Sequence, residues 1–109
     1  MLSFFKSKPF LKDLIPDNYI DIHSHLLPGI DDGAQTFEDS LRLIKALQGF
    51  GTTQIITTPH IIHNFWDNND QNIKANEEVT RKELQKNNLS IPMRAAAEYM
   101  MDDSFVNLF

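Results

Sequence analysis

Two histidines separated by one residue, His23 and His25, have the spacing in this chain that most directly suggests chemistry. Side chains two positions apart on a β-strand project from the same face, so both imidazoles can offer nitrogen atoms to one cation. Asp21 has the same spacing and could act as a further ligand or as a hydrogen-bond acceptor behind the histidines. Taken alone, the short His-x-His pattern is better explained as polar strand residues beside a loop.

Further residues that can bind metals follow at intervals along the chain. Asp31 and Asp32 precede Gly33 in the loop just beyond the histidines, and carboxylates add hard oxygen ligands. One of the two aspartates is expected to serve an ordinary Asp-Gly turn. His60 follows a Thr-Thr-Pro run, and Glu98 follows three alanines. The sequence therefore predicts a metal-capable residue near the end of each of three segments.

The elements that must position these residues alternate between strand and helix. β-branched and aromatic residues predict strands over 18–25, 52–59 and part of 89–101. Apolar residues at helical spacing predict a helix from Thr36 to about Phe50, with Thr36 and Asp39 as a variant capping box, and a mostly exposed second helix over 71–86. A β-α-β-α-β order predicts an α/β fold with parallel strands and right-handed crossovers. The three strand ends should therefore share one rim.

Composition excludes several other kinds of site. The chain has 109 residues, enough for one domain, and its 41% hydrophobic and 23% charged residues are typical of a globular protein. A formal net charge of -5 argues against a general nucleic-acid binder. The sequence contains 0 cysteines, which excludes disulfides, thiolate metal sites and a cysteine nucleophile.

Residues 1–17 are expected to form an N-terminal extension that packs Phe4, Phe5 and Phe10 on the domain. A weak contact with a membrane surface through lysine and phenylalanine side chains is the alternative. No apolar stretch is long enough for a transmembrane segment, and lysines interrupt the start too often for a signal-peptide core. A cytoplasmic location is therefore expected.

Three motifs together resemble a known superfamily. The sequences Asp-Ile-His-Ser-His-Leu-Leu-Pro-Gly-Ile-Asp-Asp-Gly (21–33), Thr-Thr-Pro-His (57–60) and Ala-Ala-Glu-Tyr-Met (96–100) are similar to the first three metal-binding motifs of the polymerase and histidinol phosphatase (PHP) superfamily. Within it, the loop after the histidines resembles the bacterial manganese-dependent protein-tyrosine phosphatases of capsular and exopolysaccharide operons. The resemblance covers nearly all of the chain after about residue 17.

The resemblance implies a distorted (β/α)7 barrel with a trinuclear metal centre at its C-terminal rim. By this resemblance His23 and His25 would bind one metal, and Glu98 would bridge it to a second. His60 and one residue of the Asp31–Asp32 pair would bind a further metal, with Asp32 favoured because it directly precedes glycine. His63 would be either a substrate contact or a residue without a role.

The function implied by the resemblance is manganese-dependent hydrolysis of phosphotyrosine on a protein, with a bacterial tyrosine autokinase as the partner. The alternatives are a small-molecule phosphoesterase of the histidinol-phosphatase type and a non-catalytic metal-binding fragment. The family pattern also includes a later histidine, an Asp-x-His and phosphate-holding arginines, whereas no histidine follows His63 and only Arg94 follows the second predicted helix. Residues 18–109 are therefore expected to be the N-terminal part of a barrel that takes about 250 residues when complete.

Overall fold

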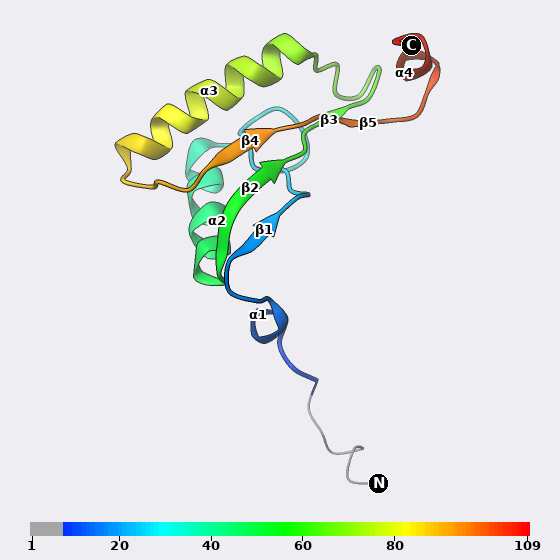
Figure 1. Ribbon diagram of the computed structural model, residues 1–109. Coiled ribbons are helices and arrows are strands. Elements are labelled where there is room, and N and C mark those ends of the chain that lie inside the picture. The colour runs from blue at the N-terminus through cyan, green and yellow to red at the C-terminus, as the bar shows by residue number, and fades with distance from the viewer. Residues whose placement is uncertain (1–7) are drawn as a thin grey trace, which may run out of the picture.

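Parallel strands form the centre of the computed structural model, which describes residues 8–109. Strands β1 (Tyr19–Asp21), β2 (Thr52–Thr57) and β4 (Met93–Ala95) form one sheet in the order β1-β2-β4. A second parallel pair, β3 (His60–Ile61) and β5 (Glu98–Tyr99), follows β2 and β4 after short breaks (Figure 1). The parallel α/β architecture predicted from the sequence is confirmed.

Helix α2 (Phe37–Gly49) begins and ends where its sequence predicts. The Thr36 hydroxyl accepts a hydrogen bond from the Asp39 backbone N–H, and the Asp39 carboxylate accepts one from the Thr36 N–H, which completes the expected capping box. Beyond the helix, Gly51 adopts a positive φ of 103°, which glycine tolerates without strain. Ile44 is fully buried on the face that packs against the sheet.

Helix α3 (Asp70–Lys86) is mostly exposed, as predicted. Asn69 caps its start by accepting a hydrogen bond from the Asn72 N–H, and only Ile73, Thr80 and Leu84 are buried. The chain leaves the helix through Asn88, whose φ of 61° lies in the left-handed region that asparagine tolerates.

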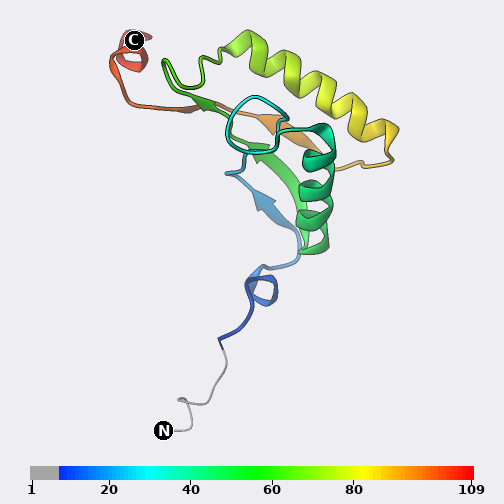
Figure 2. The ribbon, with the colours of Figure 1, turned by 180° about the vertical axis from the view of Figure 1, so that it is seen from behind.

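Both helices lie on the same side of the sheet, which leaves two layers (Figures 1 and 2). The buried core between them combines residues of the helices, the strands and the loop after β1, namely Leu26, Leu27, Ile30, Ile44, Ile55, Ile73, Leu84, Ile91 and Met93. The other side of the sheet is covered by no helix of the described part. Ile56, which points away from buried Ile55 along the same strand, is 38% exposed there.

The first strand is shorter than predicted. Strand pairing ends at Asp21, so His23 and His25 lie beyond the strand and not within it. After Asp21, hydrogen bonds to a side chain replace the regular backbone hydrogen bonds between strands. The Thr57 hydroxyl donates to the Ser24 carbonyl (2.8 Å) and accepts from the Leu26 N–H (2.9 Å). The chain after Asp21 therefore still follows β2. The third predicted strand is likewise divided into β4 and β5.

The two ends of the described chain stand away from the helical layer. A short helix, α1 (Leu11–Leu14), precedes β1, and α4 (Asp103–Val106) follows β5 (Figure 1). Phe10 is 72% exposed, so the prediction that it packs on the domain is wrong, while Phe4 and Phe5 lie outside the described residues. Between residues 8 and 109, no helix has the length and apolar character needed to cross a membrane.

Candidate metal centre

The ends of the strands bring the candidate ligands together. His60 begins β3 and Glu98 begins β5, and the two residues are direct partners in the parallel pairing. His23 and His25 follow β1, and the Thr58 N–H holds this segment beside β2 by donating to the Ser24 carbonyl. All four side chains therefore meet where the strands end, as expected for parallel strands.

A single oxygen of Glu98 lies at the centre of three imidazoles. Its Oε2 is 3.1 Å from His23 Nε2, 3.2 Å from His25 Nε2 and 3.5 Å from His60 Nδ1. One ligand atom from each of His23, His25 and Glu98 can be chosen so that all lie within 4.8 Å of one another. The predicted spatial convergence of these three residues is present, and the atoms are close enough to share a cation.

A second group of potential ligands adjoins the first. It comprises His25, Asp31, Asp32 and His60, whose ligand atoms also lie within 4.8 Å of one another. His25 is a member of both groups, and His60 connects them as well, because its Nδ1 lies 3.5 Å from Glu98 Oε2 and its Nε2 lies 3.4 Å from Asp32 Oδ1. Imidazole nitrogens combined with carboxylate oxygens suit several divalent transition metals, so the donor set fits a metal centre with neighbouring positions.

The two consecutive aspartates have different surroundings. The side chain of Asp31 is fully buried, and its oxygens receive hydrogen bonds from His25 Nδ1 (2.9 Å), the Gly33 N–H (2.9 Å) and the His60 N–H (3.0 Å). Burial alone would raise the pKa of Asp31, but these hydrogen bonds outweigh it and hold the pKa below its ordinary value. The side chain of Asp32 is 59% exposed and faces His60.

The loop between the histidines and α2 is held in place by its own polar groups. The Gln35 amide donates to the carbonyls of Asp31 (2.9 Å) and Gly33 (2.7 Å). Gly33 lies so close to His25 that a Cβ there would overlap the carbonyl oxygen and Cβ of His25. The glycine after the two aspartates is therefore required by close packing, in addition to any turn preference.

An aromatic stack that the sequence pattern does not predict adjoins the cluster. The rings of His25 and His60 stack with centroids 4.5 Å apart, and Trp66 stacks on His60 with centroids 5.2 Å apart. Antiparallel bridging between Ile62 and Trp66 folds the loop back and places the indole there. The one available signal was the presence of the chain's single tryptophan in a polar loop soon after His60.

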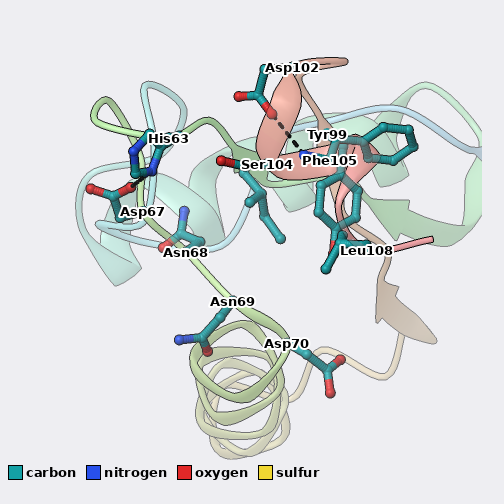
Figure 3. A pocket seen from close by; sticks show the side chains of 11 residues that line it. His63, Asp67, Asn68, Asn69, Asp70, Tyr99, Asp102, Ser104, Phe105 and Leu108 are labelled. Atoms are coloured by element: carbon teal, nitrogen blue, oxygen red, sulfur yellow. Dashed lines mark hydrogen bonds and ion pairs between the residues drawn. The ribbon is translucent and has the colours of Figure 1, made fainter.

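Two other candidates lie outside the cluster. The buried Oδ2 of Asp21 has no hydrogen-bond partner within the described part of the chain, and Asp21 belongs to neither ligand group found there. His63 Nδ1 lies 3.5 Å from Asp67 Oδ1, and both residues line a cavity of about 350 Å³ (Figure 3). Ile61 and Tyr99, which also line it, point away from His60 and Glu98 because neighbouring strand residues alternate in direction.

Known proteins are similar to this chain in sequence and in fold. Residues 19–109 match the family described as "Capsular polysaccharide synthesis, CpsB/CapC". CapC of Staphylococcus aureus is 34% identical over 74 residues, which are 66% of this chain and 29% of CapC. The tyrosine-protein phosphatase YwqE of Bacillus subtilis is 33% identical over 72 residues, which are 66% of this chain and 28% of YwqE.

A solved structure agrees with the sequence comparisons. It comes from work on YwqE of Bacillus subtilis and CpsB of Streptococcus pneumoniae, described as unique metal-dependent tyrosine phosphatases, and it matches with a TM-score of 0.71 and 28% identity. The match covers 82% of this chain and 36% of that one, so the chain corresponds to part of a PHP-type phosphatase fold. The matched segments span less than a third of the curated relatives' length. The chain belongs to the CpsB/CapC family.

Proposed function

We propose that this chain supplies metal-binding residues to a metal-dependent protein-tyrosine phosphatase that hydrolyses phosphotyrosine to tyrosine and inorganic phosphate. The observation that carries the proposal is the position of Glu98 Oε2, within 3.5 Å of the imidazoles of His23, His25 and His60. Its support from relatives is that YwqE is named a tyrosine-protein phosphatase and that the matched structure is of metal-dependent tyrosine phosphatases.

The proposed ligands are His23, His25, Asp32, His60 and Glu98. His23, His25 and Glu98 would hold one metal, and His60 with Asp32 would hold a neighbouring one. Bound divalent metal supplies Lewis-acid chemistry, in that it activates water and offsets the negative charge of a phosphoryl group. The stack of Trp66 on His60 restricts the orientation of that imidazole. The role of the chain's residues is thus to fix the positions of the cations that would offset the negative charge of the phosphoryl group.

The finer identities are also proposals. We infer manganese as the metal, with other divalent metals as the alternative, because the combination of imidazoles and carboxylates is compatible with manganese and with several other divalent cations. We infer that the substrate is a bacterial tyrosine autokinase that regulates polysaccharide export, which accords with the family's description as capsular polysaccharide synthesis. Because an autokinase consumes ATP, the reaction belongs in the cytoplasm.

A chimera tests the proposed function. Residues 19–109 would replace the matched segment of YwqE, which provides the remaining length of a relative. We expect the purified chimera with manganese to release phosphate from a phosphotyrosyl peptide in preference to histidinol phosphate. Glu98→Gln should remove this activity, while Glu78→Gln, on the exposed surface of α3, should leave it unchanged. Equal activity of both variants, or a preference for histidinol phosphate, would refute the proposal.

A further inference from the structure

We propose that Asp31 is a positioning residue that holds His25 in the tautomer with the proton on Nδ1, so that the bare Nε2 faces Glu98. The inference rests on the proposed metal centre, because it concerns the atom that His25 would offer to a metal. It gives the two consecutive aspartates separate roles, with Asp32 as the ligand and Asp31 behind the imidazole.

The hydrogen bond between the side chains of His25 and Asp31 carries the first step. Asp31 Oδ2 lies 2.9 Å from His25 Nδ1, while His25 Nε2 lies 3.2 Å from Glu98 Oε2. An ionised carboxylate can only accept hydrogen bonds, so His25 Nδ1 must be the donor in this pair. Both oxygens of Asp31 also accept hydrogen bonds from backbone N–H groups, Oδ2 from His60 and Oδ1 from Gly33, which is the arrangement expected of an ionised carboxylate. A neutral imidazole with its proton on Nδ1 has its lone pair on Nε2.

The other contacts of Asp31 occupy most of its remaining hydrogen-bonding capacity. The same Oδ2 accepts from the His60 backbone N–H at 3.0 Å, and Oδ1 accepts from the Gly33 N–H at 2.9 Å. Three donors therefore converge on one fully buried carboxylate, which also ties the first residue of β3 to the loop after β1. A metal bound through Oδ2 of Asp31 would have to displace the His25 and His60 donors, whereas Asp32, whose side chain is 59% exposed, can reach a cation without such a cost.

The role of Asp31 as an orienting group is chemically familiar. Imidazoles that bind metals commonly donate their other N–H to a carboxylate, which fixes the ring and makes the coordinating nitrogen more basic. Loss of such a partner typically weakens metal binding by about 10–100-fold. Asp31 would orient one proposed ligand through its ring and another, His60, through its backbone.

Nitrogen NMR of the 109-residue chain without metal at pH 8 reads the tautomer directly. We expect the wild-type His25 spectrum to show a protonated Nδ1 and a bare Nε2. Asp31→Ala should shift His25 toward the Nε2–H tautomer that free histidine prefers, and Asp31→Asn provides a more conservative variant if the alanine variant does not fold. Asp32→Asn is the matched control and should leave the His25 tautomer unchanged, since Asp32 faces His60.

Zinc titration, with a diamagnetic metal as the probe, provides the second readout. Zn²⁺ should shift the Nε2 resonance of His25 and preserve its Nδ1 proton, and Asp31→Asn should weaken zinc binding by about 10–100-fold. A wild-type His25 protonated on Nε2, or zinc bound through Nδ1, would overturn the inference. If the tautomer is as expected but zinc does not bind the chimera with YwqE, the role of Asp31 in orienting His25 stands and the proposed metal centre is refuted.

Discussion

The surroundings of individual residues distinguish His25 from His63. The His25 ring lies between Asp31 and Glu98, whereas His63 pairs with exposed Asp67 beside a separate cavity (Figure 3). His25→Ala should therefore weaken manganese binding by more than about 10-fold. Loss of a group that only hydrogen-bonds to a metal ligand typically costs about 10–100-fold, and His25 is proposed as a ligand itself. His63→Ala should leave binding nearly unchanged. Manganese titration followed by electron paramagnetic resonance compares the two, and equal losses would mean that His63 is a ligand.

Gly33, which has no side chain, allows the loop to pack closely against His25. A Cβ at position 33 would overlap the backbone and Cβ of His25, so Gly33→Ala should displace that histidine and reduce metal affinity. Gly49→Ala is a matched control, because a Cβ there meets no other atom within 4 Å and alanine favours a helix by about 0.5–1 kcal/mol. Isothermal titration with zinc and thermal unfolding distinguish these effects. Unchanged affinity in Gly33→Ala would show that the loop adapts.

Residue types and order predicted which side chains could meet, but not how each would be used. His23, His25, His60 and Glu98 follow or begin strands that run in one direction, so their proximity follows from the topology. The distinction between Asp31 and Asp32 depends on which carboxylate the loop buries, and both choices satisfy the same sequence pattern. The stack of Trp66 on His60 depends on a tight reversal in the intervening loop and had no periodic signal.

At the scale of elements, one threonine connects β2 to the segment that carries the histidines. Thr57 is fully buried and bonds both the Ser24 carbonyl and the Leu26 N–H. Thr57→Val keeps the volume but leaves the Leu26 N–H unpaired, which should lower the free energy of unfolding by about 1–3 kcal/mol. Urea denaturation measures the change, with exposed Thr53→Val expected to stay within about 0.5 kcal/mol. Equal stability of the two variants would contradict this role.

The sequence predicts an element well where its residues have a strong local preference for that secondary structure. Helices α2 and α3 have polar caps at Thr36 and Asn69 and buried apolar positions at helical spacing, so local sequence and packing agree. The predicted first strand is too long because Tyr19, Ile20 and Ile22 favour a strand and no turn signal follows before Pro28, yet pairing stops at Asp21. Beyond that point Thr57 and Thr58 hold the segment through different hydrogen bonds, and strand propensity cannot indicate this change.

For the molecule as a whole, the activity expected of the chain alone depends on how much of its relatives' length it covers. The matched segment represents 36% of the solved phosphatase chain, and one side of the described sheet has no helix over it. We predict that the 109-residue chain alone hydrolyses phosphotyrosyl peptide at a rate near background, because its metals would have few ligands and the phosphate few cationic partners. The chimera with YwqE should be active. Turnover by the chain alone that matches the chimera and is abolished by His23→Ala would show that no further ligands are needed.

The most direct measurement of the central claim is the location of bound manganese in the chimera. Crystals grown with manganese should give an anomalous scattering peak at coordination distance from His23 Nε2, His25 Nε2 and a carboxylate oxygen of Glu98. We predict that the peak disappears in Glu98→Gln and that a second peak lies beside His60 and Asp32. A well-ordered structure with no peak among these residues, or with manganese bound elsewhere, would contradict the proposed metal centre.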